Sequence, residues 1–332
     1  MTPGTTNSMT DIAMKAAIEA IESESATLTE KIEMLIEIAT QLQQKPKDAQ
    51  QLQQSVTLYL YAINLCQNQG QNQYPLLMAR AIAGMGTALR SIPEDGFECM
   101  EQAKDCYETA LPILQEHASP EEVAEAEMNL GVVLQTLAGA GKARLTDSIH
   151  AYQRSLRVFT GETYPQESAI LHNNIAIAYL SMPLSAEGED MRQAMAVQSF
   201  QQALQWITLI DHPSEYAMLQ NNLGNALQYL PSTHPVENSW RAVAAYDQAL
   251  RVRTARDTPI EYANTIANKA NALCNLPDDY EHPELGNPLH LQQAKAYYRE
   301  AAELFQQYGR SEQAMAMQQA IEEIEREESF AR

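Results

Sequence analysis

Apolar and polar positions recur along this chain in a long repeating pattern. Blocks that open with proline and continue with apolar residues at helical spacing begin at Pro75, Pro120, Pro165, Pro213 and Pro259, at intervals of 45, 45, 48 and 46 residues. Proline at the first position of a helix gives up only an amide that has no partner there. Each block is therefore predicted to begin a helix, here called helix A.

The far end of helix A is marked as well. A second proline follows the first by 18 residues in four of the five blocks, and these closing prolines are Pro93, Pro183, Pro231 and Pro277. Four blocks also carry glutamate two residues after the opening proline, where a carboxylate stabilises the positive end of the helix dipole. They are Glu122, Glu167, Glu215 and Glu261. Helix A is thus predicted to have one length in most copies.

A second pattern follows each helix A and predicts a second helix, helix B. A small residue precedes an aromatic residue by four positions, which puts both on one helical face. The pairs are Ala103 with Tyr107, Ser148 with Tyr152, Ala196 with Phe200, Ala242 with Tyr246 and Ala294 with Tyr298. An earlier pair, Ser55 with Tyr59, implies that residues 28–44 form a degenerate first helix A. The chain is thus predicted to be all-α, with about six helical hairpins.

The turn from helix B to the next helix A keeps one length. In each of four copies the aromatic residue precedes the next opening proline by 13 residues. Insertions collect instead in the turn from helix A to helix B. A constant stacking edge beside a variable loop edge is typical of solenoid repeat proteins.

Two motifs resemble the tetratricopeptide repeat (TPR). Helix A carries L-G-x-x-L at Leu130-Gly131 and Leu223-Gly224, and helix B carries A-x3-[YF]-x2-A. More narrowly, PSEYAMLQNNLGNALQYLP resembles the long-repeat bacterial NNLGNAL type of CHAT-associated and kinesin-light-chain-like proteins. The resemblance covers about residues 28–309, and it implies a right-handed superhelical solenoid with capping helices at its ends.

The expected domain organisation follows from the boundaries of the repeats. It comprises a disordered N-terminus over 1–9, an N-terminal helix near 10–24 with a degenerate repeat up to 70, five TPR-like repeats over 71–309, and a capping segment over 310–332 with its helix near 311–328. Two departures from the repeat pattern are Met85 and Lys269, which occupy the leucine position in the first and last of these five copies.

Asparagine recurs at the same position of helix A in several copies, and this recurrence needs an explanation. A helix-interior asparagine costs about 0.5 kcal/mol relative to alanine. The resemblance implies that this face of helix A lines the concave groove of the solenoid. The main column, nine residues after each proline, holds Asn129, Asn174, Asn222 and Asn268. The full set of predicted groove residues is Arg80, Asn129, Asn173, Asn174, Asn221, Asn222, Asn225, Asn264, Asn268 and Asn271.

Two interpretations of these amides stay open. An amide offers two hydrogen-bond donors and an acceptor, so a column of amides can bind the backbone of an extended peptide. Alternatively, the amides bond to the neighbouring repeat and set the pitch of the stack. This second interpretation suits Asn173 and Asn221 best, because they lie one residue off the column. Apart from Arg80, the lysine and arginine clamp of chaperone-binding relatives is missing, so chaperone-tail binding is not predicted.

Charge narrows the class of partner. The 43 acidic and 22 basic residues give a net charge of −21, which repels nucleic acid and anionic membrane surfaces. Acidic residues gather near both ends of the chain, where a basic segment of a partner protein can bind and where salt will weaken the contact. They include Glu19, Glu22, Glu24, Glu30, Glu33 and Glu37 at one end and Glu322, Glu323, Glu325, Glu327 and Glu328 at the other.

Expectations about localisation and redox state follow from patterns that the sequence lacks. No apolar run approaches the roughly 18 residues of a membrane span, and MTPGTTNSMT does not read as a signal peptide. A cytoplasmic protein is therefore expected. The four cysteines show no CxxC spacing, which argues against a disulfide scaffold or a zinc site.

No segment carries a recognisable catalytic or cofactor motif. The sequence GAGKA at 139–143 departs from a P-loop at Thr136 and Ala143, and the seven histidines lack metal-ligand spacing. The acidic loop 277–288 does not match an EF-hand and is interpreted as a solvated insertion. No catalytic residue, cofactor or metal is expected.

The sequence favours a non-catalytic interaction scaffold or assembly adaptor. It would bind an extended or helical segment of a partner protein in the asparagine-lined groove. Two alternatives remain: a regulator that senses a short peptide in that groove, and a metal-binding or enzymatic protein that uses the acidic loop at 278–284.

Overall fold

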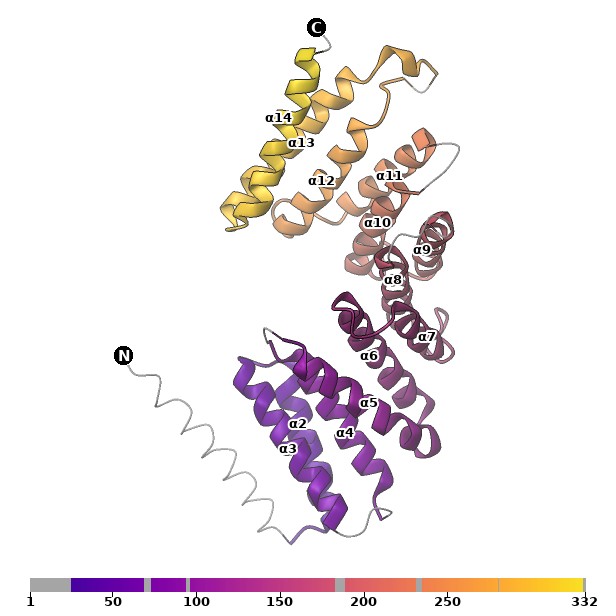
Figure 1. The fold of residues 1–332 in the computed structure, drawn as a ribbon, viewed down its shortest axis with the longest axis vertical. Coiled ribbons are helices and arrows are strands. Elements are labelled where there is room, and N and C mark those ends of the chain that lie inside the picture. Colours follow the sequence, from indigo (N-terminus) through magenta and orange to yellow (C-terminus); the bar gives the residue numbers. More distant parts are fainter. Residues whose placement is uncertain are drawn as a thin grey trace, which may run out of the picture. The chain divides into compact units, whose positions relative to one another are not determined.

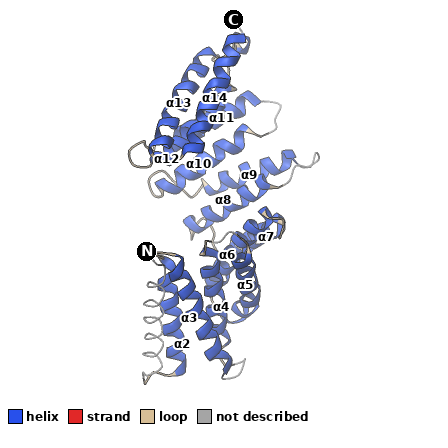
Figure 2. Ribbon diagram, turned by 60° about the vertical axis from the view of Figure 1, so that its left-hand side comes forward, coloured by secondary structure: helices blue, strands red, loops and turns tan. Residues whose placement is uncertain are grey.

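The described part of the chain is helical throughout. The computed structural model describes residues 25–68, 73–93, 96–182, 189–230, 235–279 and 281–330. Within these ranges the regular elements are α-helices, apart from one short 3-10 helix at Pro283–Leu285 (Figure 2). The predicted all-α class is confirmed. None of the helices in these ranges is both long and apolar enough to cross a membrane.

Some expectations concern residues outside the described ranges. These are the disordered segment 1–9, the helix near 10–24, the closing prolines Pro183 and Pro231, and the acidic residues Glu19, Glu22 and Glu24.

The described helices pair in six hairpins, each made of a helix A and a helix B (Figure 1). The pairs are α2 (Leu28–Gln44) with α3 (Ala49–Asn68), α4 (Pro75–Ser91) with α5 (Glu98–His117), α6 (Pro120–Gly139) with α7 (Leu145–Ser155), α8 (Pro165–Ser181) with α9 (Glu189–Ala203), α10 (Pro213–Gln228) with α11 (Pro235–Leu250), and α12 (Pro259–Cys274) with α13 (Pro288–Gln307). Helix α14 (Ser311–Phe330) follows the last pair. Every opening proline begins its helix, and α2 spans the residues predicted for the degenerate first helix A.

Helix ends follow the local signals in the sequence. Helix α4 stops at Ser91, two residues before Pro93, whereas α6 has no closing proline and continues to Gly139. A capping box begins α2: the Thr27 hydroxyl accepts from the Glu30 amide at 3.3 Å, and the Thr27 amide donates to the Glu30 carboxylate at 2.7 Å. Helix boundaries in this chain are therefore decided locally.

In two copies the connection between helix B and the next helix A is a turn held by the same side-chain bonds. The Thr208 hydroxyl donates to the Asp211 carboxylate at 2.6 Å and accepts from the Asp211 amide at 3.1 Å. Thr254 and Asp257 make the same pair of bonds at 2.9 and 3.0 Å. Because side-chain bonds of this kind hold the backbone in one turn, an insertion there would break the connection.

The helices form two compact units, Met1–Val158 and Phe159–Arg332. Helices α2–α7 belong to the first unit and α8–α14 to the second (Figure 1). In both units, aromatic residues of helix B are fully or almost fully buried, including Tyr59, Tyr107, Tyr152, Phe200 and Tyr246.

The rings of helix B explain the glycine of the L-G motif. A methyl group added at Gly131 would lie 2.4 Å from the Tyr152 ring, and one at Gly224 would lie 2.6 Å from the Tyr246 ring. A side chain at either position would therefore separate the two helices of its hairpin. The glycine of the motif is thus explained by close packing within a hairpin.

The departure at Lys269 has a structural explanation. This lysine is buried at the leucine position, and its ammonium group donates to the Asp247 carboxylate at 2.5 Å and to the Tyr297 hydroxyl at 3.4 Å. Burial is the largest single influence and lowers the pKa of Lys269, but the hydrogen bonds and charge interactions with Asp247 and Tyr297 together outweigh it and leave that pKa above its usual value. A charged residue is tolerated in the core here because it is paired.

Helix α14 closes the second unit. The Lys295 ammonium donates to both carboxylate oxygens of Glu328 at 2.8 Å, and Arg299 lies 3.4 Å from Glu325. Ala314 and Ile324 of α14 are buried in the core of the unit. Its outer face carries exposed glutamates, which fits the terminal helix of a repeat stack.

Candidate partner-binding site

The asparagine column lies on helices α8, α10 and α12 of the second unit. Asn174, Asn222 and Asn268 each follow the opening proline of their helix by nine residues, and α10 contacts both α8 and α12. All three residues are half-buried. Asn173 and Asn221, one residue earlier, are each only 7% exposed. The repeat therefore places five amides, from three helices, at about the same distance from the start of each helix.

These five amides form a continuous hydrogen-bonded ladder. The Asn268 amide donates to the Asn221 side-chain oxygen at 3.3 Å, and Asn221 donates to Asn222 at 3.3 Å. Asn222 then donates to Asn173 at 2.9 Å, and Asn173 donates to Asn174 at 3.3 Å. The ladder runs from α12 through α10 to α8, with every donor pointing the same way.

The ladder fits the chemistry of asparagine. Since Asn173 and Asn221 are buried, the bonds they make offset the cost of removing their amides from water. Each amide carries two N–H groups and an oxygen with two lone pairs, and one ladder bond uses only part of that capacity. The half-buried members, Asn174, Asn222 and Asn268, keep bonding capacity on the solvent side.

A second row of polar groups lies three to six residues further along the same helices. The Tyr246 hydroxyl donates to the Asn225 oxygen at 2.7 Å. Gln228 donates to the Asn268 backbone carbonyl at 3.2 Å and accepts from the Asn271 amide at 3.1 Å. This row ties α11 and α10 to α12, so Asn225 and Asn271 are held by neighbours from other helices.

Gln228 is a site residue that the sequence patterns did not single out. A signal existed, because glutamine follows the motif glycine by four residues in two copies, as Gln135 and Gln228. Both glutamines bond to the hydroxyl of the helix B tyrosine, Gln135 accepting from Tyr152 at 2.8 Å and Gln228 donating to Tyr246.

The remaining predicted residue of the second unit, Asn264, lies half-buried on α12, one turn before Asn268 and outside the ladder. Nearer the start of the helices are Glu167, Glu215 and Glu261. Within the described residues none of these three carboxylates forms an ion pair, and Glu215 receives only a long bond of 3.5 Å from Gln166. This end of the helix A face therefore carries negative charge.

Arg80, in the first unit, is engaged by a carboxylate of its own chain. Its guanidinium donates to both oxygens of Glu122, at 2.7 and 2.8 Å, across α4 and α6. This hydrogen bonding raises the pKa of Arg80 and holds the pKa of Glu122 below its usual value. Arg80 is therefore paired within the chain, and it is not an unpaired site for the carboxylate of a ligand.

A cavity of about 250 Å³ adjoins this ion pair. Arg80, Glu122 and Asn129 line it, so the structure brings the two predicted groove residues of the first unit together. Gly84 occupies the column position of this copy, and the Tyr59 ring lies so close that a methyl group on Gly84 would be 2.5 Å from it. An asparagine cannot fit there, which explains why the column begins only at Asn129.

The Arg80–Glu122 pair predicts an acid-dependent contribution to stability. Because the folded-state pKa of Glu122 is lowered from 4.5, the contribution is present above about pH 4.5 and is lost as the pH falls through the folded pKa. Both side chains are about a third or more exposed, so the pair is expected to contribute less than about 1 kcal/mol. Urea unfolding should show Glu122→Gln less stable than wild type near pH 7, and the difference should shrink as the pH falls below about 4.5.

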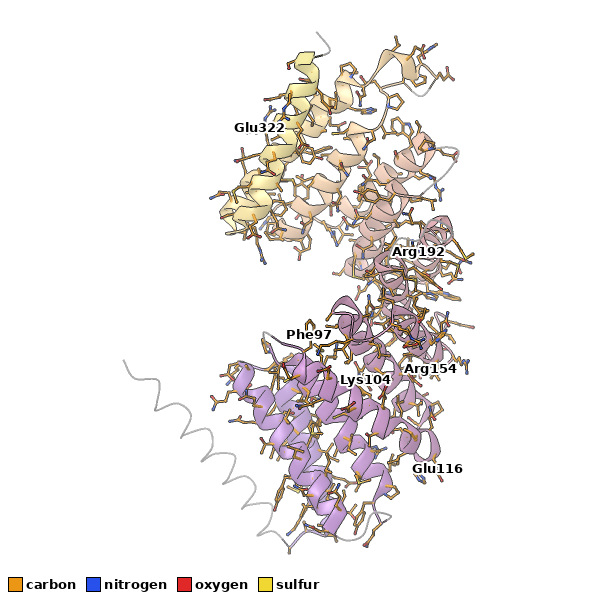
Figure 3. All side chains as sticks on the ribbon, in the orientation of Figure 1. Phe97, Lys104, Glu116, Arg154, Arg192 and Glu322 are labelled. Atoms are coloured by element: carbon orange, nitrogen blue, oxygen red, sulfur yellow. The ribbon has the colours of Figure 1, made fainter. Side chains whose placement is uncertain are left out.

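The matched control for that comparison is Glu116→Gln, which removes the same charge from a carboxylate that is 76% exposed at the end of α5 (Figure 3). This control should match wild type throughout this pH range. A difference between Glu122→Gln and wild type that does not shrink as the pH is lowered would show that the ion pair is not its cause.

The described residues of the acidic loop at 277–288 make contacts that hold part of this loop in place. The Asp278 carboxylate accepts from the backbone amides of Leu289 and His290, each at 2.8 Å, and so caps the start of α13. No group of three His, Cys, Asp or Glu side chains within the described ranges could hold a metal ion. All four cysteines are free thiols.

The predicted site residues thus fall into three sets. Asn173, Asn174, Asn221, Asn222 and Asn268 make the ladder, Asn225 and Asn271 make the adjacent row with Asn264 beside it, and Arg80 and Asn129 line the cavity of the first unit. The ladder amides bond between helices, as the interpretation based on repeat stacking requires. Their role in binding a partner stays a prediction.

Comparison with known proteins informs the fold. No family model and no curated protein matches the chain. Among solved structures, BtubC (BKLC) from P. vanneervenii is similar, with 15% identity, 78% of this chain and 92% of that chain covered, and a TM-score of 0.53.

Two further structures align less well. Rap protein complexed with Competence and Sporulation Factor aligns at 12% identity over 91% of this chain and 99% of that chain, with a TM-score of 0.38. The TPR2AB domain of yeast Sti1 in complex with pHSP90 aligns at 14% identity over 88% and 99%, with a TM-score of 0.28. At such scores these two alignments support no inference about this chain.

Likeness at this level of identity concerns the fold alone. The narrower resemblance to the long-repeat NNLGNAL type therefore stays a prediction. Proline-initiated A helices, aromatic-bearing B helices and the small residues on which those aromatic rings pack give this chain a tetratricopeptide-like helical-repeat fold.

Proposed function

We propose that this protein is a non-catalytic cytoplasmic scaffold or assembly adaptor that binds an extended or helical segment of a partner protein. The observation that carries the proposal is the asparagine ladder across α8, α10 and α12. Stacking of the hairpins could be achieved with apolar residues, as at most other helix A positions. Repeated asparagine at a cost in helix propensity is better explained by a second task.

The ladder suits recognition of a peptide backbone. Amides held in place by one another are pre-organised, so a bound segment orders few additional side chains. Neighbouring helices pack about 8–10 Å apart, and an extended chain advances about 3.3 Å per residue. A segment crossing α8, α10 and α12 would thus pass one helix about every three residues, and six to nine residues would span the ladder.

The charge near the ladder favours a basic segment. Glu167, Glu215 and Glu261 recur at the start of the three helices without an ion-pair partner in the described residues. The chain as a whole carries a net charge of −21. Lysine or arginine side chains on the partner would complement these glutamates and the net negative charge of the chain. Rising salt would weaken the contact.

The test combines site-specific crosslinking with a ladder variant. A photo-crosslinking amino acid replaces Ile177, which is 36% exposed on α8 three residues after Asn174. Partners crosslinked in cells are identified by mass spectrometry. The double substitution Asn222→Ala with Asn268→Ala, made in the same background, is expected to reduce the crosslinked product at least tenfold.

Stability is measured in parallel, because the same substitutions remove ladder bonds. The double variant removes three ladder bonds, each contributing about 0.5–1.5 kcal/mol, and each alanine recovers about 0.5 kcal/mol of helix propensity, so a loss of about 0.5–3.5 kcal/mol is expected. Gln201→Ala with Gln202→Ala, on the exposed face of α9, is the control and should leave crosslinking unchanged. A clear fall in stability with full crosslinking would show that the ladder only stacks repeats.

A further inference from the structure

We propose that the cavity in the first unit binds one basic side chain, arginine or lysine, of a partner segment. The inference rests on the proposed function insofar as the side chain belongs to a bound protein segment. It concerns a different unit of the chain from the asparagine ladder, and its residues include several that no sequence pattern singled out.

The cavity has the size for a single side chain. Its volume of about 250 Å³ is smaller than the roughly 300–1,000 Å³ of pockets that hold drug-sized ligands. Residues of α2, α3, α4, α5 and α6 contribute to its walls. Ala83, Gly84 and Leu114 give it an apolar part, against which the aliphatic stem of an arginine or lysine can pack.

The charge of the cavity favours a cation. Glu122 and Glu125 both line it, and Glu33 lies close enough to raise the pKa of Arg80. Arg80 is the one basic residue among the described lining residues, and Glu122 already holds it with two hydrogen bonds. Glu125 is exposed and therefore adds a negative charge that the Arg80–Glu122 pair does not neutralise.

The hydrogen-bonding groups point to the same ligand. Gln43 lines the cavity, and its side-chain oxygen is buried and accepts no hydrogen bond from the protein. The hydroxyls of Tyr59 and Tyr107 are already bonded to Thr40 at 2.9 Å and Thr87 at 2.8 Å. Since an unmet buried acceptor is costly, an ammonium or guanidinium group in the cavity would supply the missing donor once the Gln43 side chain turns its oxygen toward it.

The test uses three short peptides and the full chain. Ac-Ala-Ala-Arg-Ala-Ala-NH2 is titrated into protein labelled at its alanine methyl groups, and the resonances of Ala83 and Ala126, which line the cavity, are followed by NMR. Peptides with citrulline or glutamate in place of arginine are compared with it. Citrulline keeps the shape of arginine and removes its charge.

The arginine peptide is expected to shift the Ala83 and Ala126 resonances and to bind at least about fivefold more tightly than the citrulline peptide. Equal affinity for these two peptides, tighter binding of the glutamate peptide, or no shift at about 10 mM peptide would each overturn the proposal. Tighter binding of glutamate would show that Arg80 leaves Glu122 to bind carboxylates instead.

A charge-matched pair of variants locates the effect. Glu125→Gln should weaken binding of the arginine peptide about three- to tenfold without loss of fold, because Glu125 is exposed. Glu116→Gln removes the same charge from an exposed side chain of α5 that does not line the cavity, and it should leave the affinity almost unchanged (Figure 3). If both variants weaken binding equally, the cavity is not the site.

The two proposals fail separately. Loss of crosslinking in the ladder variant, together with an arginine peptide that does not bind, would overturn the cavity proposal alone. Arginine-selective binding at Ala83 and Ala126 with crosslinking unaffected by the ladder variant would overturn the role of the ladder and leave the cavity as a binding site.

Discussion

Arg154→Ala is expected to lower the free energy of unfolding by about 2–3 kcal/mol. The Arg154 guanidinium, on α7 (Figure 3), donates to both carboxylate oxygens of Glu127 on α6 at 2.7 Å. The Glu127 side chain is only 4% exposed, so removing the arginine leaves a buried charge without a partner. The estimate lies below that for a fully buried pair because Arg154 is 42% exposed. Urea unfolding followed by far-UV circular dichroism measures the change.

The control is Arg144→Ala, in which the lost arginine is 80% exposed and bonds to Asp147 with similar geometry. It should cost less than about 1 kcal/mol. Adding Glu127→Gln to Arg154→Ala removes the unpaired charge and should recover at least half of the loss. If the double variant is no more stable than Arg154→Ala, lost packing rather than the buried charge is the cause.

Gly224→Ala is expected to destabilise the second unit by about 1–2 kcal/mol, although alanine is the better helix former by about 1 kcal/mol. The added methyl group would lie 2.6–2.9 Å from three atoms of the Tyr246 ring. That ring is fully buried and its hydroxyl is bonded to Asn225 and Gln228, so it cannot move away cheaply. Both tryptophans, Trp206 and Trp240, lie in the second unit, and their fluorescence in urea reports its unfolding.

Gly139→Ala serves as the comparison, because a methyl group at Gly139 meets nothing within 4 Å. Followed by circular dichroism, this variant should be as stable as wild type or up to about 1 kcal/mol more stable. Equal stability of Gly224→Ala and wild type would mean that the two helices of that hairpin separate without cost and that the L-G motif has another cause.

The fold could be predicted from the sequence to a large extent because its signals are local. Proline at the start of a helix, a second proline beyond its end and a small residue four positions before an aromatic residue act within one hairpin. The structure accordingly begins α4, α6, α8, α10 and α12 at the predicted prolines. The extension of α6 to Gly139 agrees with the same logic, since that copy has no closing proline.

The candidate site was only partly predictable. The register of Asn174, Asn222 and Asn268 was visible from the repeat, but the bonds that join them are diagonal, through Asn173 and Asn221 of the adjoining register. Which amide meets which depends on the offset between neighbouring helices, and a single sequence does not specify that offset. Gln228 was missed because its role depends on Tyr246, a residue of another helix.

Arg80 is another residue whose role could not be predicted from the sequence alone. Its sequence position suggested a basic residue open to a ligand, whereas the structure pairs it with Glu122, a residue that the sequence pattern assigned to the dipole of its own helix. The two residues are 42 positions apart and meet only because α4 and α6 lie close together.

By itself, then, the sequence determined the helical class, the hairpin repeat, and where most helices begin and end. These depend on backbone propensity and on contacts within a repeat. The tertiary structure decided which amides bond to one another, that Arg80 is neutralised by Glu122, and that an acceptor-rich cavity lies beside Asn129. Those features depend on how far one helix is shifted against the next, which side-chain packing sets and residue spacing along the chain does not.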